Sequence, residues 1–585
     1  MYIAKFLSIF FFVCLSTEGI HAAEKQENPF KKAKATIISK GFAAELKTSQ
    51  IKKRPGLTQE QMNLRHQLFE QKRNAYMALR NKTNQPNVNP QNATSKALLP
   101  QNILKANNFQ TKDLALSPNF LAGTLAESGF IPPDGDGYVG TKQYIVCLNG
   151  LIKSFRKNGK ADGVLDLSTT SFFSSVISDI PGYFTYTSDP RIIFDKPTKR
   201  WFITMDDVSL NNVGYEFPDN KVLLAVSDGK HDGEITGDTV WSFYSFHPGT
   251  IRPQSDWFVD FGYIADSPTL GIDRHALYMG LNVFSFQIDF LTSDLFVINK
   301  EALLKEKKLK ITPFRDFVNP HTGLGMFDPQ GVTNFDKDAK EGFFVGADFA
   351  NLSTLHMRRI IRPGSDSPSI SKDITMAIPI TAQPLFVPAK GSVNAIDAND
   401  NRLDQAHIRN KKLYTSQTIA VNNKGRSGGS VDRDGSRWYE FSLANPGKPE
   451  LIQVGTLHDP TDTLTPLSYF FPSVMTNKHH TMILGCTVAG ANAFLNAAVT
   501  YRHADDEKGF LHKVRTYTHS TTAYNVQNVT PQRWGDYSIS SPDPDDESLW
   551  TCQEYCNDTN SWGVRVGRLH KKHDRDHETS HSHSK

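Results

Sequence analysis

A short apolar phrase recurs seven times along the chain, each time after a polar turn. It consists of two bulky residues, any residue and then a small one. The copies are Tyr144-Ile145-Val146-Cys147, Trp201-Phe202-Ile203-Thr204, Leu277-Tyr278-Met279-Gly280, Phe343-Phe344-Val345-Gly346, Leu413-Tyr414-Thr415-Ser416, Ile483-Leu484-Gly485-Cys486 and Leu549-Trp550-Thr551-Cys552. They begin 57, 76, 66, 70, 70 and 66 residues apart. Self-similarity at such spacing indicates a repeat architecture, and this period accommodates one four-stranded sheet with its loops. The pattern predicts an all-β, seven-bladed β-propeller.

Polar residues recur two positions after the small one, on the same strand face. They are Asn149, Asp206, Asn282, Asp348, Thr418 and Glu554, with Val488 as the exception. Folding each incoming strand back about its turn places Asp189 opposite Asp206, Asp266 opposite Asn282, Asp328 opposite Asp348, Asp536 opposite Glu554, Asp136 near Asn149 and Arg402 near Thr418. The ends of the hairpins would then form a mostly acidic collar around one mouth of the propeller channel. The candidate ligand-binding residues are Asp136, Asp189, Asp206, Asp266, Asp328, Asp348, Arg402, Arg533, Trp534, Asp536 and Glu554.

Three interpretations of this collar stay open. Aspartates at strand entries commonly accept hydrogen bonds from loop N–H groups, and this structural role is the simplest. Crowded carboxylates would also suit Ca²⁺, although we predict no cofactor and assign no metal ligands. As a ligand site, the collar would offer Arg402 and Arg533 as anion donors and Trp534 as an aromatic platform.

The N-terminus has the features of an export signal. Lys5 precedes an apolar run over residues 6–15, and residues 20–22 offer a cleavage site that ends at Ala22. We therefore expect residues 1–22 to be removed and the protein to be secreted or periplasmic. Of the cysteines that remain, Cys147, Cys486 and Cys552 occupy the small position of the repeat, which favours compact buried thiols over disulfides, and Cys556 lies too far along the strand to pair with Cys552.

Positive charge is concentrated ahead of the repeats. The net charge is +4, yet residues 24–82 hold 14 Lys and Arg against 5 Asp and Glu, which leaves residues 83–585 at −5. Thr58 and Gln61 form a capping-box pattern that predicts an amphipathic helix over residues 58–81. This basic helix would either contact a membrane or envelope surface or pack as a strut against the propeller.

The remaining segments complete the expected domain organisation. Residues 23–82 form the basic arm, residues 83–117 an Asn-, Gln- and Pro-rich linker, residues 118–569 the propeller, and residues 570–585 a disordered His-rich tail. The last strand, over residues 562–567, is placed to join the first and last blades.

The chain resembles a group of secreted bacterial β-propeller proteins of largely unassigned function. The stretches that carry the resemblance are residues 132–140, 189–190 with 200–202, 224–228, 268–273, 401–403, 437–440, 533–537 and 562–567. The resemblance implies the propeller fold over about residues 120–570. It implies no catalytic residue.

Two main functional hypotheses follow. The first is a monomeric exported module that binds or scaffolds a protein, glycan or envelope polymer at the collar, with peripheral membrane or envelope contact through residues 24–82. The second is a carbohydrate-active enzyme, a glycoside hydrolase or lyase of sialidase-like geometry, that uses the acidic residues of the collar with Arg191, Arg402, Arg533 and Tyr537. A third hypothesis makes the protein an envelope-associated structural spacer. No phosphate loop, nucleotide fingerprint or metalloprotease helix is present, and we expect no nucleic-acid partner.

Overall fold

The computed structural model describes residues 30–32, 35–38, 41–83, 114–218, 220–251, 263–319, 321–528 and 530–571. The predicted signal peptide, most of the predicted linker and the His-rich tail beyond Lys571 lie outside the described residues. Within the described part, no helix is long and apolar enough to cross a membrane.

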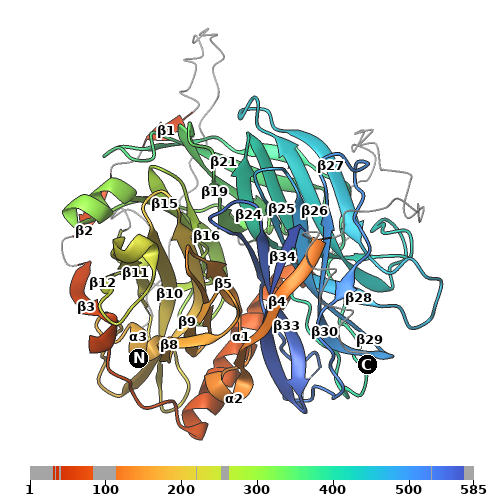
Figure 1. Cartoon of the computed structure of the whole chain (residues 1–585), viewed down its shortest axis with the longest axis horizontal. Coiled ribbons are helices and arrows are strands. Elements are labelled where there is room, and N and C mark those ends of the chain that lie inside the picture. The colour runs from red at the N-terminus through yellow and green to blue at the C-terminus, as the bar shows by residue number, and fades with distance from the viewer. Residues whose placement is uncertain are drawn as a thin grey trace, which may run out of the picture.

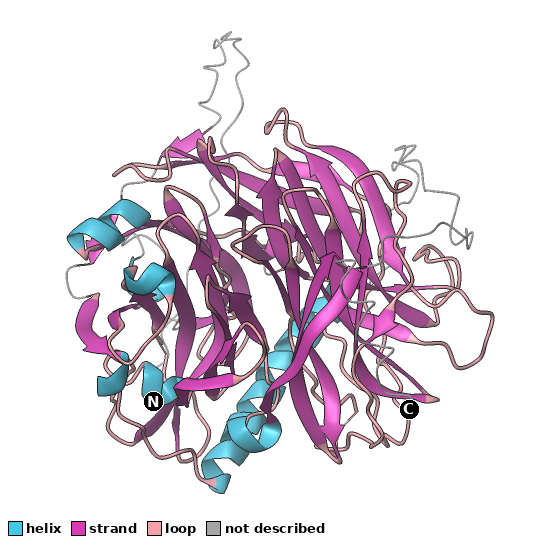
Figure 2. Ribbon diagram, in the orientation of Figure 1, coloured by secondary structure: helices cyan, strands magenta, loops and turns pink. Residues whose placement is uncertain are grey.

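The strands of the described residues form seven separate sheets, here called blades 1 to 7 in chain order (Figures 1 and 2). Blade 1 holds β5 (Asp136–Val139), β6 (Gln143–Leu148), β7 (Leu151–Arg156) and β8 (Ala161–Leu167). Blade 2 holds β9 (Tyr183–Asp195), β10 (Arg200–Asn211), β11 (Val222–Ser227) and β12 (Val240–Phe246). Blade 3 holds β13 (Ile264–Asp266), β14 (Gly271–Ile272), β15 (Ala276–Phe284), β16 (Phe290–Asn299) and β17 (Leu309–Phe314). Blade 4 holds β18 (Phe327–Gly331), β20 (Glu341–Ala347), β21 (Thr354–Ile361), β22 (Ser369–Ser371) and β23 (Ile374–Ala377).

The remaining three blades continue the same pattern. Blade 5 holds β19 (Thr333–Asn334), β24 (Leu403–Arg409), β25 (Lys412–Val421), β26 (Arg433–Ser442) and β27 (Glu450–Leu457). Blade 6 holds β28 (Ser468–Thr476), β29 (Met482–Gly490), β30 (Ala493–Arg502) and β31 (Arg515–Thr516). Blade 7 holds β32 (Ile539–Pro542), β33 (Leu549–Asp558), β34 (Ser561–Lys571) and β4 (Leu114–Thr124). Neighbouring blades are in contact all round, and β32 of blade 7 contacts β5 of blade 1, so the ring is closed. The predicted seven-bladed propeller is confirmed.

The ring is fastened by a strand from before the repeats. β4 pairs antiparallel with β34, which places Leu114–Thr124 at the outer edge of the last blade. The predicted closing strand, residues 562–567, lies within β34 and contributes the other half of this junction. β4 begins four residues before the start that the sequence suggested for the propeller, because an apolar strand from residue 114 continues the sheet.

The basic arm is built into the blades. β3 (Phe42–Lys47) pairs with β12, β2 (Thr36–Ile38) with β17 and β1 (Phe30–Lys32) with β22, so the arm adds an outer strand to blades 2, 3 and 4 in turn. The chain then passes through the short helix η1 (Thr48–Gln50) into α1 (Gln59–Thr83), by far the longest helix in the part of the chain that the structure describes. The predicted capping box is present: the Gln61 N–H donates to Thr58 Oγ1 at 3.2 Å, and the Thr58 N–H donates to Gln61 Oε1 at 2.9 Å.

The other helical segments among the described residues are short and lie in loops. They are α2 (Leu125–Ser128), α3 (Thr169–Phe172), the 3₁₀ segments η3 (Lys230–Gly233) and η4 (Pro248–Ile251), and the short π-helix η6 (Ala302–Glu306).

The small position of the repeat faces the next blade. A Cβ added to Gly280 of blade 3 would lie 1.9 Å from the carbonyl oxygen of Pro329 in blade 4. The cysteines that fill this position in other blades are fully buried, and all four described cysteines are unpaired. Close approach of neighbouring sheets therefore explains why the phrase ends on a small residue.

A backbone kink recurs where the incoming strands of several blades enter. Asp134, Asp189, Ser267, Asp328 and Phe471 all have positive φ, between 43° and 54°. All but Asp134 precede a proline. Each of these non-glycine residues adopts a conformation that costs about 1–3 kcal/mol and that persists only because the surrounding structure fixes it. The kink shifts the register, so some predicted pairs are wrong. In blade 2, Asp206 lies opposite Ser188 instead of Asp189. In blade 4, Phe327 pairs with Ala347 just before the kink, and Asp328 does not pair with Asp348.

Candidate functional site: an acidic collar covered by a basic helix

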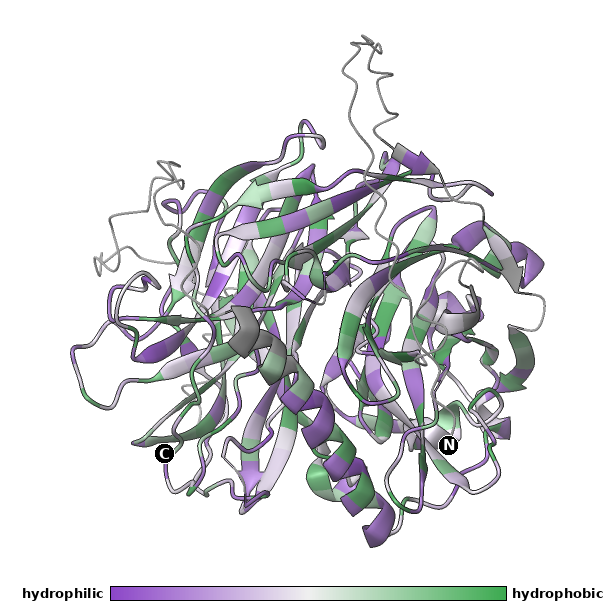
Figure 3. Cartoon of the chain, turned by 180° about the vertical axis from the view of Figure 1, so that it is seen from behind, coloured by the Kyte–Doolittle hydropathy of each residue, from purple (hydrophilic) through white to green (hydrophobic). Residues whose placement is uncertain are grey.

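Helix α1 lies across one mouth of the channel. Figure 3 shows it in front of the blades, crossing between the two halves of the ring. Its residues contact several blades: Arg65 Nη1 donates to the carbonyl of Ile131 ahead of blade 1 at 2.9 Å, and Arg73 Nε donates to Asp397 in the loop that enters blade 5. Leu68 is 1 % exposed and packs into an apolar cluster that spans blades 2 to 4. The strut interpretation of the basic helix is thus the one realised in the fold.

Lys72 supplies the main cation under the helix. Its ammonium nitrogen lies 2.8 Å from Asp266 Oδ1 and 3.3 Å from Glu216 Oε2, and all three side chains are at least nine-tenths buried. Burial lowers the pKa of Lys72, but the carboxylates of Asp266 and Glu216 more than offset this, and its pKa lies well above the ordinary value. Lys72 is therefore charged at every physiological pH.

Arg65 provides a second buried cation. Its guanidinium lies between the rings of Phe69 and Phe130, 4.3 and 4.1 Å from their centroids. Burial lowers its pKa to about 10, which keeps it charged at neutral pH. The aromatic faces replace part of the water that a charged side chain loses on burial.

A cavity lies between α1 and the channel mouth. Its lining includes five of the predicted collar residues, namely Asp189, Asp266, Arg402, Arg533 and Asp536. Phe69, Lys72 and Arg73 close it from the helix side, and Asp397, Asn399 and Asp400 add polar groups that the sequence did not suggest. The collar exists as a cluster, and the protein's own helix covers it.

Acidic residues crowd the centre of the collar. One carboxylate oxygen from each of Asp134, Asp189 and Asp536 lies within 4.8 Å of the others, and the same holds for Asp189, Asp206 and Asp266. Burial raises the pKa of Asp189 to about 7, and the carboxylates of Asp266 and Asp536 raise it too. Burial also raises the pKa of Asp206 well above its ordinary value, with Asp189 adding to the shift.

The collar also locks blades together, in part through an aspartate that accepts a loop N–H group as the structural interpretation predicts. Asn149 of blade 1 donates to Asp134 Oδ2 at 2.6 Å and accepts the N–H of Asp189 in blade 2 at 2.9 Å. Asp134 Oδ1 in turn accepts the N–H of Asp536 ahead of blade 7 at 2.9 Å. Asp134 thus takes the place beside Asn149 that the sequence assigned to Asp136, which pairs with Cys147.

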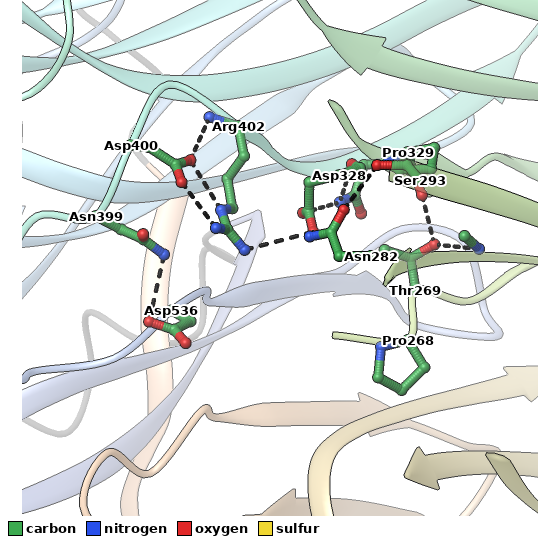
Figure 4. A network of polar contacts seen from close by, with 12 residues as sticks. Pro268, Thr269, Asn282, Ser293, Asp328, Pro329, Asn399, Asp400, Arg402 and Asp536 are labelled. Atoms are coloured by element: carbon green, nitrogen blue, oxygen red, sulfur yellow. Dashed lines mark hydrogen bonds and ion pairs between the residues drawn. The ribbon is translucent and has the colours of Figure 1, made fainter. Parts of the chain in front are cut away.

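The arginines of the collar are held in ion pairs. Arg402 binds Asp400 through Nε and Nη2, both at 2.8 Å, and reaches Asp328 at 3.4 Å (Figure 4). Asp328 also accepts from Asn282 Nδ2 at 2.8 Å. Arg533 pairs with Asp536 at 2.5 Å, which itself accepts from Asn399.

Four other predicted collar residues, Asp136, Asp348, Trp534 and Glu554, do not line this cavity. Asp136 lines a second cavity further along the channel, with Arg191 and Asp404. Glu554 is buried beside Gly535 and close to Asp134. Trp534 is fully buried and donates from its indole N–H to Thr487 Oγ1, so it offers no aromatic platform. That prediction is wrong because the ring fills the core between blades 6 and 7.

Asp348 takes a structural role in blade 4. Its Oδ2 lies 2.9 Å from His356 Nε2, while Asp373 Oδ2 lies 2.7 Å from His356 Nδ1. Asp348 Oδ1 accepts the N–H groups of Ala350 and Asn351, and Asp348 does not line the cavity under α1.

This Asp348–His356–Asp373 triad predicts a pH effect on stability. Burial lowers the pKa of His356, but the two carboxylates more than offset this and raise it to about 9. A histidine with a raised folded-state pKa stabilises the fold below about pH 6.5 by about 3 kcal/mol, and this is lost as the pH rises through about 9. We expect the difference in free energy of unfolding between the wild type and His356→Gln to shrink between about pH 6 and pH 9.5. Denaturant titrations would measure it, and a difference independent of pH would contradict this account.

Comparison with known proteins adds little. No protein-family model matches the chain, and no curated protein matches it. Similar solved structures include an α-L-arabinanase from Penicillium chrysogenum with arabinobiose, at 9 % identity and a TM-score of 0.33 over 77 % of this chain and 98 % of that one. They also include an exo-β-1,3-galactanase from Clostridium thermocellum, at 11 % identity and a TM-score of 0.27 over 66 % of this chain and 78 % of that one. A protein of unknown function from Dyadobacter fermentans matches at 8 % identity and a TM-score of 0.27 over 67 % of this chain and 100 % of that one. Similarity at this level says nothing about a shared activity, and the seven-bladed assignment rests on the strand pairing described above.

Proposed function

We propose that this protein is a β-propeller binding module that recognises a protein partner at the mouth covered by α1, through a basic segment that docks as α1 does. The proposal is carried by one observation: the Lys72 ammonium lies between the Asp266 and Glu216 carboxylates. A surface that accommodates one basic amphipathic helix suits another with the same spacing of charged and apolar side chains.

In this proposal α1 acts as an internal ligand. One face of α1 carries Arg65, Leu68 and Lys72, which are spaced three and four residues apart, and Arg73 is adjacent to Lys72. This face therefore presents cations together with an apolar anchor. A partner would have to displace α1. Its apparent affinity would equal the affinity for the open mouth multiplied by the fraction of molecules in which the mouth is open.

The contacts of the collar weigh against the carbohydrate-active alternative. A sialidase-like enzyme needs arginines that receive a substrate carboxylate, whereas Arg402 and Arg533 are occupied by Asp400 and Asp536. A glycoside hydrolase needs two carboxyl groups that flank an accessible sugar. Here the acids of the collar lie beneath Phe69 and Lys72 of α1.

A peptide of residues 59–83, added in trans, tests the proposal. We expect it to bind the full chain carrying Lys72→Ala and Arg73→Ala at least about tenfold more tightly than the wild type, because those changes loosen the internal helix. Fluorescence anisotropy measures this, and binding should weaken as salt is added. The control peptide has glutamine at the positions of Lys72 and Arg73 and should not bind.

Absence of binding to both chains would overturn the proposal. Binding on a glycan array instead would favour a glycan partner. Turnover of sialosides or polyuronates that Asp536→Ala abolishes without unfolding would favour the enzyme.

We also propose that the module works outside the cytoplasm, as the export signal suggests. N-terminal sequencing of the mature protein should find the first residue close after Ala22. A mature chain that begins at Met1 would argue against export by this route.

A further inference from the structure

Three carboxylates converge beneath α1 from two blades. Asp189 on β9, Asp206 on β10 and Asp266 on β13 each place an oxygen within 4.8 Å of the other two. The three residues are 4 %, 0 % and 7 % exposed.

Asp206 has no hydrogen-bond partner for either carboxylate oxygen among the residues that the structure describes. Buried polar atoms in proteins are nearly always satisfied, and an unsatisfied buried carboxylate is among the most costly. A side chain kept in this state, and directed at two other carboxylates, points to a ligand.

Lys72 does not meet this need. Its ammonium is bound to Asp266 at 2.8 Å and lies 3.3 Å from Glu216, which is a fourth buried acid. One cation thus faces four carboxylates, and none of the contacts of Lys72 is a hydrogen bond to Asp206. The carboxylate oxygens of Asp206 remain for a second cation, which on binding would displace any proton that Asp206 holds.

We propose that Asp189, Asp206 and Asp266 form a binding site for a divalent cation, best suited to Ca²⁺. The donors are all oxygens, which hard cations prefer to nitrogen or sulfur. Ca²⁺ accepts irregular sets of carboxylate and water ligands, whereas Mg²⁺ demands near-octahedral geometry and gives up its water reluctantly. Asp189 and Asp266 line the cavity under α1, which leaves room on that side for water ligands.

The neighbouring group of Asp134, Asp189 and Asp536 is not assigned as a site. Asp134 accepts hydrogen bonds from Asn149 and from the Asp536 N–H, and Asp536 is paired with Arg533. These two acids already have partners, in contrast to Asp206.

Calcium binding to the full-length chain is the first test. After removal of metal with a chelator, isothermal titration with Ca²⁺ should show one site per chain, and Mg²⁺ should bind more weakly. The midpoint temperature of thermal unfolding, Tm, should rise by about 3 °C when the free Ca²⁺ concentration is about 100 times Kd. No binding of either cation would overturn the proposal and leave the acids as a proton-sharing cluster.

Asp206→Asn separates a ligand from a structural residue. Without metal, this variant should be at least as stable as the wild type, since it removes an unsatisfied carboxylate, yet it should bind Ca²⁺ at least about tenfold more weakly. The control is Asp207→Asn, the next residue of β10. Asp207 accepts the N–H groups of Ser178 and Lys221, both at 2.7 Å, so this variant should lose stability and keep the calcium response. Equal Ca²⁺ affinity in Asp206→Asn and wild type would place the ion elsewhere and contradict the assignment.

Discussion

Replacing Lys72 by methionine is expected to lower the free energy of unfolding by about 3–5 kcal/mol at about pH 8. The change leaves Asp266 and Glu216 buried without their cation, and removing one partner of a buried ion pair costs far more than the pair contributes. The loss should be smaller at about pH 5, where Glu216 can take up a proton. Burial already raises the pKa of Glu216 to about 7 with Lys72 present, and loss of that cation raises it further.

Denaturant unfolding at the two pH values measures this effect, with limited proteolysis of residues 59–83 to detect a detached helix. Lys47→Met is the matched control, because Lys47 pairs with Asp238 at an exposed site and its loss should change little. An equal loss at both pH values, or none at either, would show that Lys72 does not neutralise the collar.

Replacing Gly280 by alanine is expected to lower the free energy of unfolding by about 3 kcal/mol or more. The added Cβ would lie 1.9 Å from the carbonyl oxygen of Pro329, which belongs to the backbone of the next blade and cannot rotate away. Thr269 tightens this contact: its hydroxyl donates to that carbonyl at 2.7 Å and accepts the Gly280 N–H at 2.9 Å (Figure 4). The two blades would have to separate.

Gly56→Ala is the control for this prediction, because no heavy atom lies within 4 Å of the position of its added Cβ. Thermal and denaturant unfolding should show that Gly280→Ala has the lower free energy of unfolding, by about 3 kcal/mol or more, and that Gly56→Ala is as stable as the wild type. Equal stability would mean that the small position of the repeat is not set by contact between blades.

The repeat of the propeller could be predicted because its cause is local. Each hairpin needs two bulky residues for the core and a small one against the next blade. These residues lie within four consecutive positions in every copy, so the pattern can be recognised in the sequence. The pairing of Asp266 with Asn282, predicted from the turn alone, is observed.

The exact register of the collar could not be predicted, since it depends on kinks that the alternation of polar and apolar residues does not reveal. At Asp189 the backbone adopts φ of 53° before Pro190, which moves the pairing by one residue. The burial of Trp534 likewise depends on neighbours in sequence-distant blades, such as Thr487.

The position of the basic arm is the largest feature that the sequence leaves open. β3 pairs with β12, about 200 residues further along the chain, and no local pattern identifies its partner. Two signals pointed the right way: the excess of positive charge in residues 24–82 and the negative charge of the rest. They indicate attraction, but they do not state which acids Lys72 and Arg73 will meet.

Hydrogen–deuterium exchange across residues 59–83 of the intact chain tests most directly whether a basic helix occupies the acidic mouth of this propeller. We expect its amides to exchange as slowly as those of the blade strands in the wild type. In Lys72→Glu, which sets a fifth acid among four, they should exchange rapidly while the blades stay protected. Rapid exchange of this helix in the wild type, at the rate of the free peptide, would contradict the account.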